Sequence, residues 1–160
     1  MNFFDAITHS FVTIATGGFS TKNISIAHFN SVPIEIVIFV FMILSGIHFG
    51  LLFSTIFEGS KKIFKSTVVR YYVLAIVIGA VLTTFCLYGD QYNNCFEALR
   101  YAAFLITSIG TSTGFATTDN SVWPALAQIL VIFFALQCAC AGSTSGGIKV
   151  GSPDKLKNLQ

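Results

Sequence analysis

Charged residues are scarce in this sequence. Only 10% of its 160 residues are Asp, Glu, Lys or Arg, whereas 54% are apolar and the mean hydropathy is +0.75. A soluble domain carries about a quarter charged residues, so water is not the main solvent of this chain. The net charge of +2 is small, and the basic residues form no stripe with interleaved aromatic residues, so a nucleic-acid partner is not expected.

Motifs for metal binding, redox chemistry and catalysis are also missing. The four cysteines are Cys86, Cys95, Cys138 and Cys140. They show no C-x-x-C spacing and no neighbouring histidine, so a zinc or redox site has no support, and we expect packed thiols in preference to a Cys86–Cys95 disulfide. No Ser/His/Asp or Cys/His constellation is recognisable, and the chain is not expected to be an enzyme.

The isolated polar residues of the apolar segments and their boundaries are interpreted as structural, not as functional sites. His48 is expected to make a hydrogen bond between helices and not to bind a metal. Glu35, Asp90 and Asp119 are interpreted as a solvated rim. The amino terminus does not resemble a signal peptide, because it has no basic leading segment and Asp5 interrupts its apolar run.

Three apolar segments are long enough to cross a membrane. They cover residues 33–57, 68–88 and 124–142, and a helix rises 1.5 Å per residue. Pro33 and Pro124 stand where a first helical turn tolerates the missing N–H group. The sequence therefore predicts three membrane-spanning helices.

Two further apolar segments are too short to cross. Residues 5–14 and 95–109 have the length of re-entrant half-helices, and Asn94 followed by Glu97 indicates a capped helix start. Each segment leads into a polar loop that contains glycine, at residues 15–21 and 111–117. Irregular backbone at membrane depth requires protein or a water-filled path around it, so these loops are the functional candidates.

Charge predicts on which side of the membrane the loops lie. Basic residues cluster after the first and third long segments, at Lys61, Lys62, Lys65 and Arg70 and at Lys149, Lys155 and Lys157. The positive-inside rule places these residues in the cytoplasm. Both short helices and their glycine loops then enter from the outer face, where only Lys22 and Arg100 remain.

The chain also contains an internal repeat. Superposing Gly18 on Gly114 aligns Thr-Gly-Gly-Phe-Ser-Thr at residues 16–21 with Ser-Thr-Gly-Phe-Ala-Thr at residues 112–117, and Pro33 and Pro124 then open the next helix of each copy. We predict a partial unit over residues 1–58, a complete unit over residues 59–150, and a tail at residues 151–160. The tail is polar, and a non-native addition, a truncation and a divergent native end are all open explanations for it.

These motifs resemble a known family. Residues 4–6 with 15–21 resemble the second pore loop of the TrkH-like membrane subunits of the Trk/Ktr/HKT superfamily of potassium uptake proteins, and residues 111–117 with 139–149 resemble the third. The resemblance covers about residues 3–150. It implies an all-α integral membrane fold of repeated units, each with an outer helix, a re-entrant pore helix with a filter loop, and an inner helix, as in potassium channels.

The resemblance also implies the site. Backbone carbonyl oxygens would hold a dehydrated cation, and glycine at positions 18 and 114 would permit the required backbone angles. The expected filter residues are Thr16, Gly17, Gly18 and Phe19 in the first unit and Ser112, Thr113, Gly114 and Phe115 in the second. No bound cofactor is expected, and potassium, the transported ion, is the only metal, held through those carbonyls alone.

A second glycine-rich segment follows the third apolar stretch. By resemblance, Gly142, Ser143, Thr144, Ser145, Gly146, Gly147 and Lys149 form an intramembrane gating loop beneath the filter. Ser145 stands where the family pattern has glycine. A phosphate-binding loop is excluded, since Ile148 separates Lys149 from the glycine that it would have to follow directly. A helix end with a polar tail is the structural alternative.

The resemblance implies partners and a location as well. They are the potassium ion, the lipid bilayer, the remaining pore repeats of a parent protein, a cytosolic nucleotide-binding regulatory subunit and a second copy in a homodimer, in a bacterial plasma or inner membrane. Two alternatives of other classes stay open. One is a secondary transporter with broken helices, and the other is a membrane scaffold that transports nothing.

Overall fold

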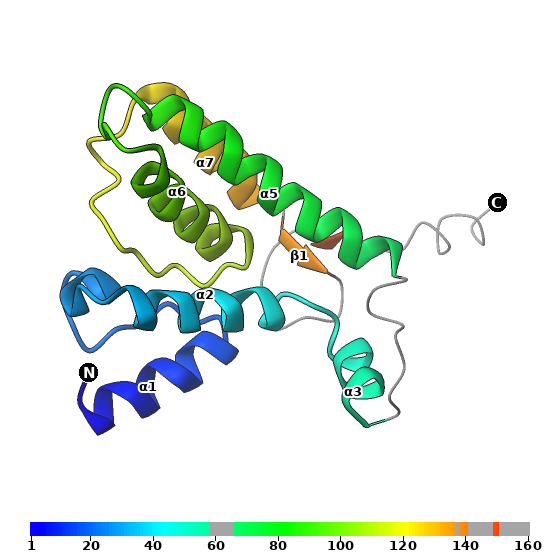
Figure 1. The fold of residues 1–160 in the computed structure, drawn as a ribbon. Helices are drawn as coiled ribbons and strands as arrows, with labels where there is room; N and C mark the ends of the chain where they lie inside the picture. The colour runs from blue at the N-terminus through cyan, green and yellow to red at the C-terminus, as the bar shows by residue number, and fades with distance from the viewer. Residues whose placement is uncertain (58–65, 137, 141–148, 151–160) are drawn as a thin grey trace.

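The computed structural model describes residues 1–57, 66–136, 138–140 and 149–150, and these residues are mostly helical (Figure 1). The elements in chain order are α1 (Phe3–Ile14), the 3-10 helix η1 (Ser25–Phe29), α2 (Val32–Ser45), α3 (Phe49–Phe57), α5 (Thr67–Leu87), α6 (Cys95–Gly110), α7 (Ala125–Leu136), β1 (Cys138–Cys140) and β2 (Lys149–Val150). The two short strands pair in parallel, an addition to the all-helical fold that the sequence predicts.

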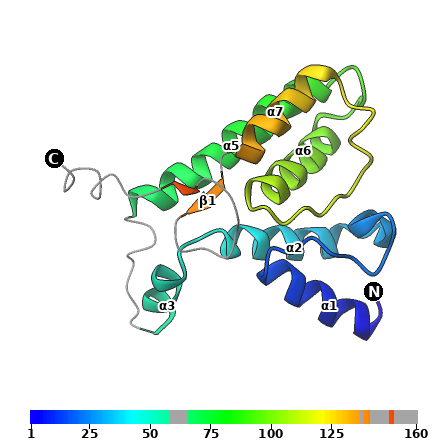
Figure 2. The ribbon, with the colours of Figure 1, turned by 180° about the vertical axis from the view of Figure 1, so that it is seen from behind.

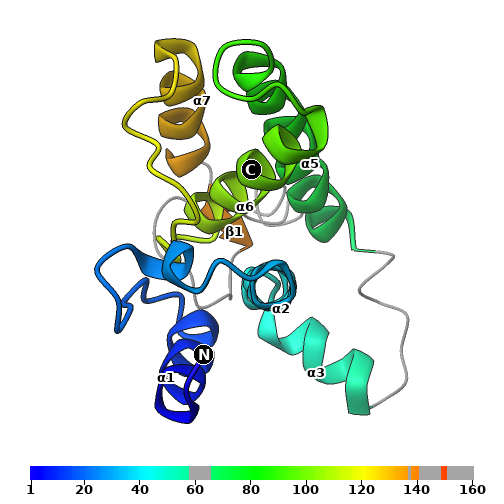
Figure 3. The same ribbon diagram turned by 60° about the vertical axis from the view of Figure 1, so that its left-hand side comes forward.

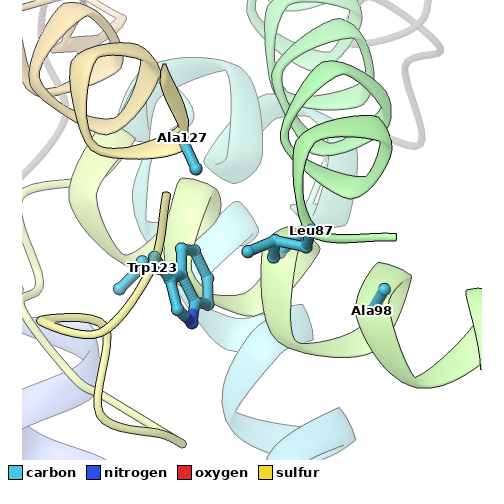
Figure 4. Close-up of a cluster of buried hydrophobic side chains, with 6 residues drawn as sticks. Leu87, Ala98, Trp123 and Ala127 are labelled. Carbon is cyan, nitrogen blue, oxygen red and sulfur yellow. The ribbon is translucent and has the colours of Figure 1, made fainter. Parts of the chain in front are cut away.

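The second unit packs its three helices around small residues. Helix α6 lies beside α5 and α7, as the front and back views show (Figures 1 and 2). Trp123, just before α7, is 3% exposed and lies among Leu87, Ala98 and Ala127, which are fully buried (Figure 4). In Figure 4, Leu87 lies between the Trp123 ring and Ala98, and Ala127 lies above the ring. The cluster therefore joins α5, α6 and α7 through side chains that are buried together.

The first unit packs α1 against α2 and joins the second through a shared apolar cluster (Figure 3). That cluster consists of Ile26, Ile38, Met42, Phe104 and Phe115. The first three residues belong to the first unit and the last two to the second. Close packing of these side chains, and not removal of apolar area from water, holds such a contact together within a membrane, so the cluster links the two units.

The long predicted segments fold differently from the prediction of three uninterrupted spans. Among the described residues, only α5 is long and apolar enough to cross a membrane by itself. The predicted segment 33–57 is broken between Ser45 and Phe49, and the chain direction bends by 105° at this break. At the break, a side chain on Gly46 would collide with the hydroxyl of Tyr72 on α5, and Tyr72 donates a 3.3 Å hydrogen bond to the Ile43 carbonyl.

The third predicted span, 124–142, is not one continuous helix over the described residues. Helix α7 ends at Leu136, and residues 138–140 form β1. When Pro33 is aligned with Pro124, as in the predicted repeat, Leu136 aligns with Ser45, the last residue of α2. Helices α2 and α7 therefore end at corresponding positions. Asn94 caps α6 as predicted, by accepting a 3.1 Å bond from the Phe96 amide, and Cys86 and Cys95 are free thiols.

Candidate functional site

Helices α1 and α6 end in the same way. After α1, the Thr16 amide bonds the Thr13 carbonyl at 3.3 Å and the Gly17 amide bonds the Val12 carbonyl at 2.9 Å. After α6, the Ser112 amide bonds the carbonyl three residues earlier and the Thr113 amide the one five residues earlier, each at 2.8 Å. This pair of bonds is the Schellman motif, which reverses the chain at a helix end by main-chain bonding alone.

Backbone angles repeat as well. Thr16 and Ser112 take left-handed angles with φ of 49° and 57°, and two residues later Gly18 and Gly114 do so with φ of 71° and 81°. Left-handed backbone costs a non-glycine residue about 1–2 kcal/mol, and the Schellman position usually holds glycine or asparagine. The structure therefore places both predicted glycines in the conformation that favours glycine, at matching points of two superposable turns.

The two loops lie against each other. A side chain on Gly18 would collide with the carbonyl oxygen of Thr113 and would stand 3.5 Å from the Cα atom of Gly114. A side chain on Gly114 would find only the Cα atom of Gly18, at 3.9 Å. Position 18 therefore requires glycine for two reasons: its own left-handed backbone angle, and the close approach of the second loop. Both helices point their negative carboxyl ends at this junction, which favours a cation there.

Segments of the first unit also hold the second loop. The Ala27 amide in η1 donates to the Ala116 carbonyl at 3.2 Å, and the Ala116 amide donates to Ser25 Oγ at 3.3 Å. Phe115 is fully buried in the cluster between the units, whereas Phe19, its counterpart in the first loop, is 78% exposed. The second loop is thus seated in the first unit, and the matching phenylalanine of the first loop projects outward.

The loop carbonyls fall into two groups. The Phe115 carbonyl accepts a 2.7 Å bond from Ser108 Oγ, and the Thr113 carbonyl faces Gly18, so these two have protein neighbours. Within the described part of the chain, no group donates a hydrogen bond to the carbonyls of Gly17, Gly18 or Gly114. Gly17 and Gly114 lie on the exposed side of the turns. Carbonyls without internal partners are available to water or to an ion.

Polar side chains of α1 brace the first loop. Thr21 Oγ1 donates to Asp5 Oδ1 at 2.6 Å, and Lys22 Nζ lies 3.6 Å from Asp5 Oδ2. The Thr21 bond is the main reason that the pKa of the Asp5 carboxyl lies below its ordinary value of 3.8. One turn further along α1, His9 Nε2 lies 2.9 Å from Ser20 Oγ. These contacts were not predicted, although the i, i+4 spacing of Asp5 and His9 places them on one helix face.

The second loop is braced differently. Thr111 Oγ1 bonds the Thr107 carbonyl and Thr113 Oγ1, both at 2.8 Å, within the loop's own unit. Tyr101 stands where the repeat would place the counterpart of Asp5. Thr117, the counterpart of Thr21, accordingly keeps a buried hydroxyl with no partner among the described residues. The two turns share a backbone and differ in their side-chain support.

An ion pair between α6 and α2 joins the two units. Arg100 on α6 donates from Nε and Nη2 to the two carboxylate oxygens of Glu35 on α2, each at 2.7 Å. The Glu35 side chain is 6% exposed and that of Arg100 is 26% exposed. The prediction of Glu35 as a solvated rim residue is therefore wrong. Arg100 is the one basic residue of α6, and an arginine in a mostly apolar helix was the signal for a carboxylate partner.

The predicted gating loop and Asp119 are not part of the two glycine loops at residues 15–21 and 111–117. Of the predicted gating loop, Gly142 to Gly147 fall outside the described residues, and Lys149 lies in β2. Asp119 lies in the exposed loop before α7, where a hydrogen bond from Ser121 Oγ lowers the pKa of its carboxyl. The described residues contain no group of three or more His, Cys, Asp or Glu side chains that could hold a metal ion.

Known proteins share both the sequence and the fold. The family model for TrkH, described as a cation transport protein, matches residues 1–151. The Trk system potassium uptake protein TrkH of Escherichia coli K12 is 36% identical over 152 residues, covering 94% of this chain and 32% of that protein. The Trk system potassium uptake protein TrkG of the same strain is 31% identical over 150 residues. The match covers 93% of this chain and 31% of TrkG.

A solved structure matches as well. The crystal structure of the potassium transporter TrkH from Vibrio parahaemolyticus superposes with a TM-score of 0.86 at 34% sequence identity, over 99% of this chain and 36% of that one. The chain thus spans about a third of the length of the relatives it matches. Its helical fold is that of a membrane protein, and its apolar composition agrees with this. The chain belongs to the TrkH family of cation transport proteins.

Proposed function

We propose that this chain contributes two neighbouring parts of a potassium pathway, in which the loops at residues 15–21 and 111–117 line the filter. The observation that carries this proposal is the pair of matched turns that meet at Gly18 and Gly114. A carbonyl-lined filter needs successive carbonyls aimed at one axis from several chain segments. Two identical main-chain turns, placed side by side at the ends of two helix dipoles, are suited to that task.

The predicted filter residues take unequal parts in this proposal. The carbonyls of Gly17, Gly18 and Gly114 are the strongest candidates for ion contact, because none of them has a hydrogen-bond donor among the described residues. Thr16 and Ser112 hold the turns in their left-handed conformation. The remaining members of the set are Phe19, Thr113 and Phe115, of which Thr113 and Phe115 have carbonyls that face protein atoms.

Two loops cannot close a four-part ring, so the activity belongs to a parent protein with further repeats. The units at 1–58 and 59–150 would each supply one part of that ring. By family resemblance, the partners are a cytosolic nucleotide-binding regulatory subunit and a second copy in a homodimer, and the location is a bacterial inner membrane. The segment 142–149 would form the gate beneath the filter.

Substitution of the glycines tests the filter assignment in the full-length parent. Gly18→Ser and Gly114→Ser each place a side chain on left-handed backbone inside the paired loops. Gly89 is a matched control, because its φ of 93° is also left-handed and a side chain there would meet nothing within 4 Å. The ratio of potassium to sodium uptake, normalised to the amount of protein in the membrane, should change in both loop variants and stay constant in Gly89→Ser.

The refuting outcome is equally clear. Loops that merely pack would give less folded protein in the two loop variants, Gly18→Ser and Gly114→Ser, and an unchanged uptake ratio in both. Membrane topology offers an independent check, since Lys22 and Lys61 should be accessible from opposite faces. Labelling of both residues from one side would contradict the proposed orientation.

A secondary transporter with broken helices is the second candidate. The observation in its favour is that α2 and α7 stop at aligned positions, Ser45 and Leu136. Corresponding breaks are typical of transporters whose binding site lies at the midplane between repeats. Currents that reverse at the potassium equilibrium potential, whatever the proton and sodium gradients, would support the filter pathway over this alternative.

A further inference from the structure

His9 is a buried histidine for which the filter proposal provides no role. Its side chain, on the inner face of α1, is 2% exposed. Nδ1 lies 2.7 Å from the Asp5 carbonyl oxygen, and Nε2 lies 2.9 Å from Ser20 Oγ. A carbonyl oxygen can only accept, so Nδ1 carries the proton, and in the neutral ring Nε2 accepts from the Ser20 hydroxyl.

Ser20 is held on its other side as well. Its Oγ accepts a 3.1 Å bond from the Lys22 amide, so the hydroxyl proton remains available for Nε2. The neutral ring with the proton on Nδ1 therefore satisfies every polar atom of this small network. Ser20 follows Gly18 by two residues, so the bond fixes the descending limb of the first loop to its own pore helix.

The same ring touches the second loop. The centroid of the Phe115 ring lies 5.7 Å from that of His9, with the rings inclined by 34°. Phe29 packs edge-on against His9 at 5.5 Å. His9 thus holds one loop by a hydrogen bond and contacts the other loop by ring packing. No other contact described above reaches both loops from a single side chain.

We propose that His9 is a positioning residue that sets how the two loops lie against each other, and through this the cation preference of the pathway. This inference rests on the proposed filter. The ring stands behind the loops and does not touch the ion. Its effect would be to hold Ser20 and Phe115 in register, so that the Gly18 and Gly114 turns meet as the structure shows.

The repeat supplies a matched control. The positions that align with His9 and Ser20 in the second unit hold Leu105 and Ala116, so the second turn has the same backbone without this polar pair. His9→Leu alone leaves the Ser20 hydroxyl without its acceptor. His9→Leu combined with Ser20→Ala reproduces the pair that the second unit uses. Gln at position 9 keeps an acceptor that can reach Ser20.

The experiment measures the potassium-to-sodium uptake ratio of the full-length parent, normalised to folded protein in the membrane. We expect His9→Leu to change the ratio by about fivefold, the equilibrium effect of losing one hydrogen bond, because the half-buried Ser20 hydroxyl then has no acceptor on α1. The double variant and His9→Gln should return to within about twofold of the wild-type ratio. Ser20→Ala alone only removes an oxygen and should shift the ratio in the same direction as His9→Leu. It replaces His9→Leu as the test if the His9→Leu protein does not accumulate in the membrane.

Other outcomes overturn the inference. A ratio unchanged in His9→Leu and in Ser20→Ala, with only the yield affected, would show that His9 merely packs. If His9→Leu and Ser20→Ala leave the ratio unchanged while Gly18→Ser and Gly114→Ser change it, the role of His9 is refuted and the filter proposal stands. If the two glycine variants also leave the ratio unchanged, the filter itself is refuted. Nitrogen-15 spectra of the His9 ring give a second test, because a proton on Nε2 in place of Nδ1 would contradict the proposed network.

Discussion

The ion pair between Glu35 and Arg100 should be the strongest single bond between the two units. Its two hydrogen bonds are charge-assisted, each is 2.7 Å long, and the guanidinium also lies over the Tyr101 ring at 5.1 Å. Removal of one partner leaves a buried charge, which typically costs 3–5 kcal/mol. Since Arg100 keeps 26% of its side chain exposed, we expect the lower end, about 3 kcal/mol, for Arg100→Met.

A double-mutant cycle isolates the pair. Glu35→Gln keeps an acceptor for the guanidinium and should cost about 1–2 kcal/mol. Glu35→Leu alone leaves the Arg100 charge unpaired, whereas Glu35→Leu combined with Arg100→Met removes both charges. The cost of the double variant should therefore fall short of the sum of the Glu35→Leu and Arg100→Met costs by about 2 kcal/mol. The measurement is the free energy of unfolding of the full-length parent in detergent, obtained with a chemical denaturant.

The Lys22–Asp5 pair provides the control. Its 3.6 Å separation and the 30% exposure of the Lys22 side chain predict a loss below about 1 kcal/mol for Lys22→Met. If Arg100→Met costs no more than Lys22→Met, or if the double variant is simply additive, the pair does not hold the units together. The apolar cluster around Phe115 and the hydrogen bonds of Ala116 with Ser25 and Ala27 would then hold the units together.

Three further results are expected. Gly18→Ala should lower the melting temperature more than Gly114→Ala. Left-handed backbone costs both variants about 1–2 kcal/mol, but only the alanine at position 18 would collide with the Thr113 carbonyl. Equal melting temperatures would contradict this. The lowered pKa of Asp5 stabilises the fold above pH 3.8 and ceases to do so as the pH falls through the folded value, so the melting difference from Asp5→Asn should shrink in acid; a constant difference would exclude the carboxylate. Cys95, exposed at the start of α6, should react with an impermeant maleimide on intact cells, and reaction only after permeabilisation would reverse the topology.

The sequence predicted the parts of the fold that depend on local pattern. Helices α1 and α6 are found within two residues of the predicted half-helices 5–14 and 95–109, and α5 matches 68–88 closely. Short apolar runs bounded by a cap and a glycine turn carry that information within themselves. The repeat rested on a few identical residues, yet the backbone angles at Thr16, Gly18, Ser112 and Gly114 match it.

The errors arose where contacts distant in sequence decide the outcome. Hydropathy gives Gly46 no special weight, whereas in the structure a tyrosine from α5 occupies the space beside it and bonds the carbonyl of Ile43. Glu35 looked like a rim residue because its partner lies 65 positions away. His9 was assigned no role for the same reason, since its contact with Phe115 depends on how the two units pack.

The Schellman turns after α1 and α6 have a consequence for how such a protein can diverge. Their shape is encoded by main-chain hydrogen bonds and by two left-handed positions, so it requires little of the other side chains. Threonine replaces glycine between positions 17 and 113, and alanine replaces serine between 20 and 116, while the turn persists. Duplicated copies can therefore accumulate different side chains around an unchanged backbone template. Each copy can then acquire its own supporting contacts, as the Thr21–Asp5 bond beside the first turn and the Thr111–Thr113 bond within the second turn show.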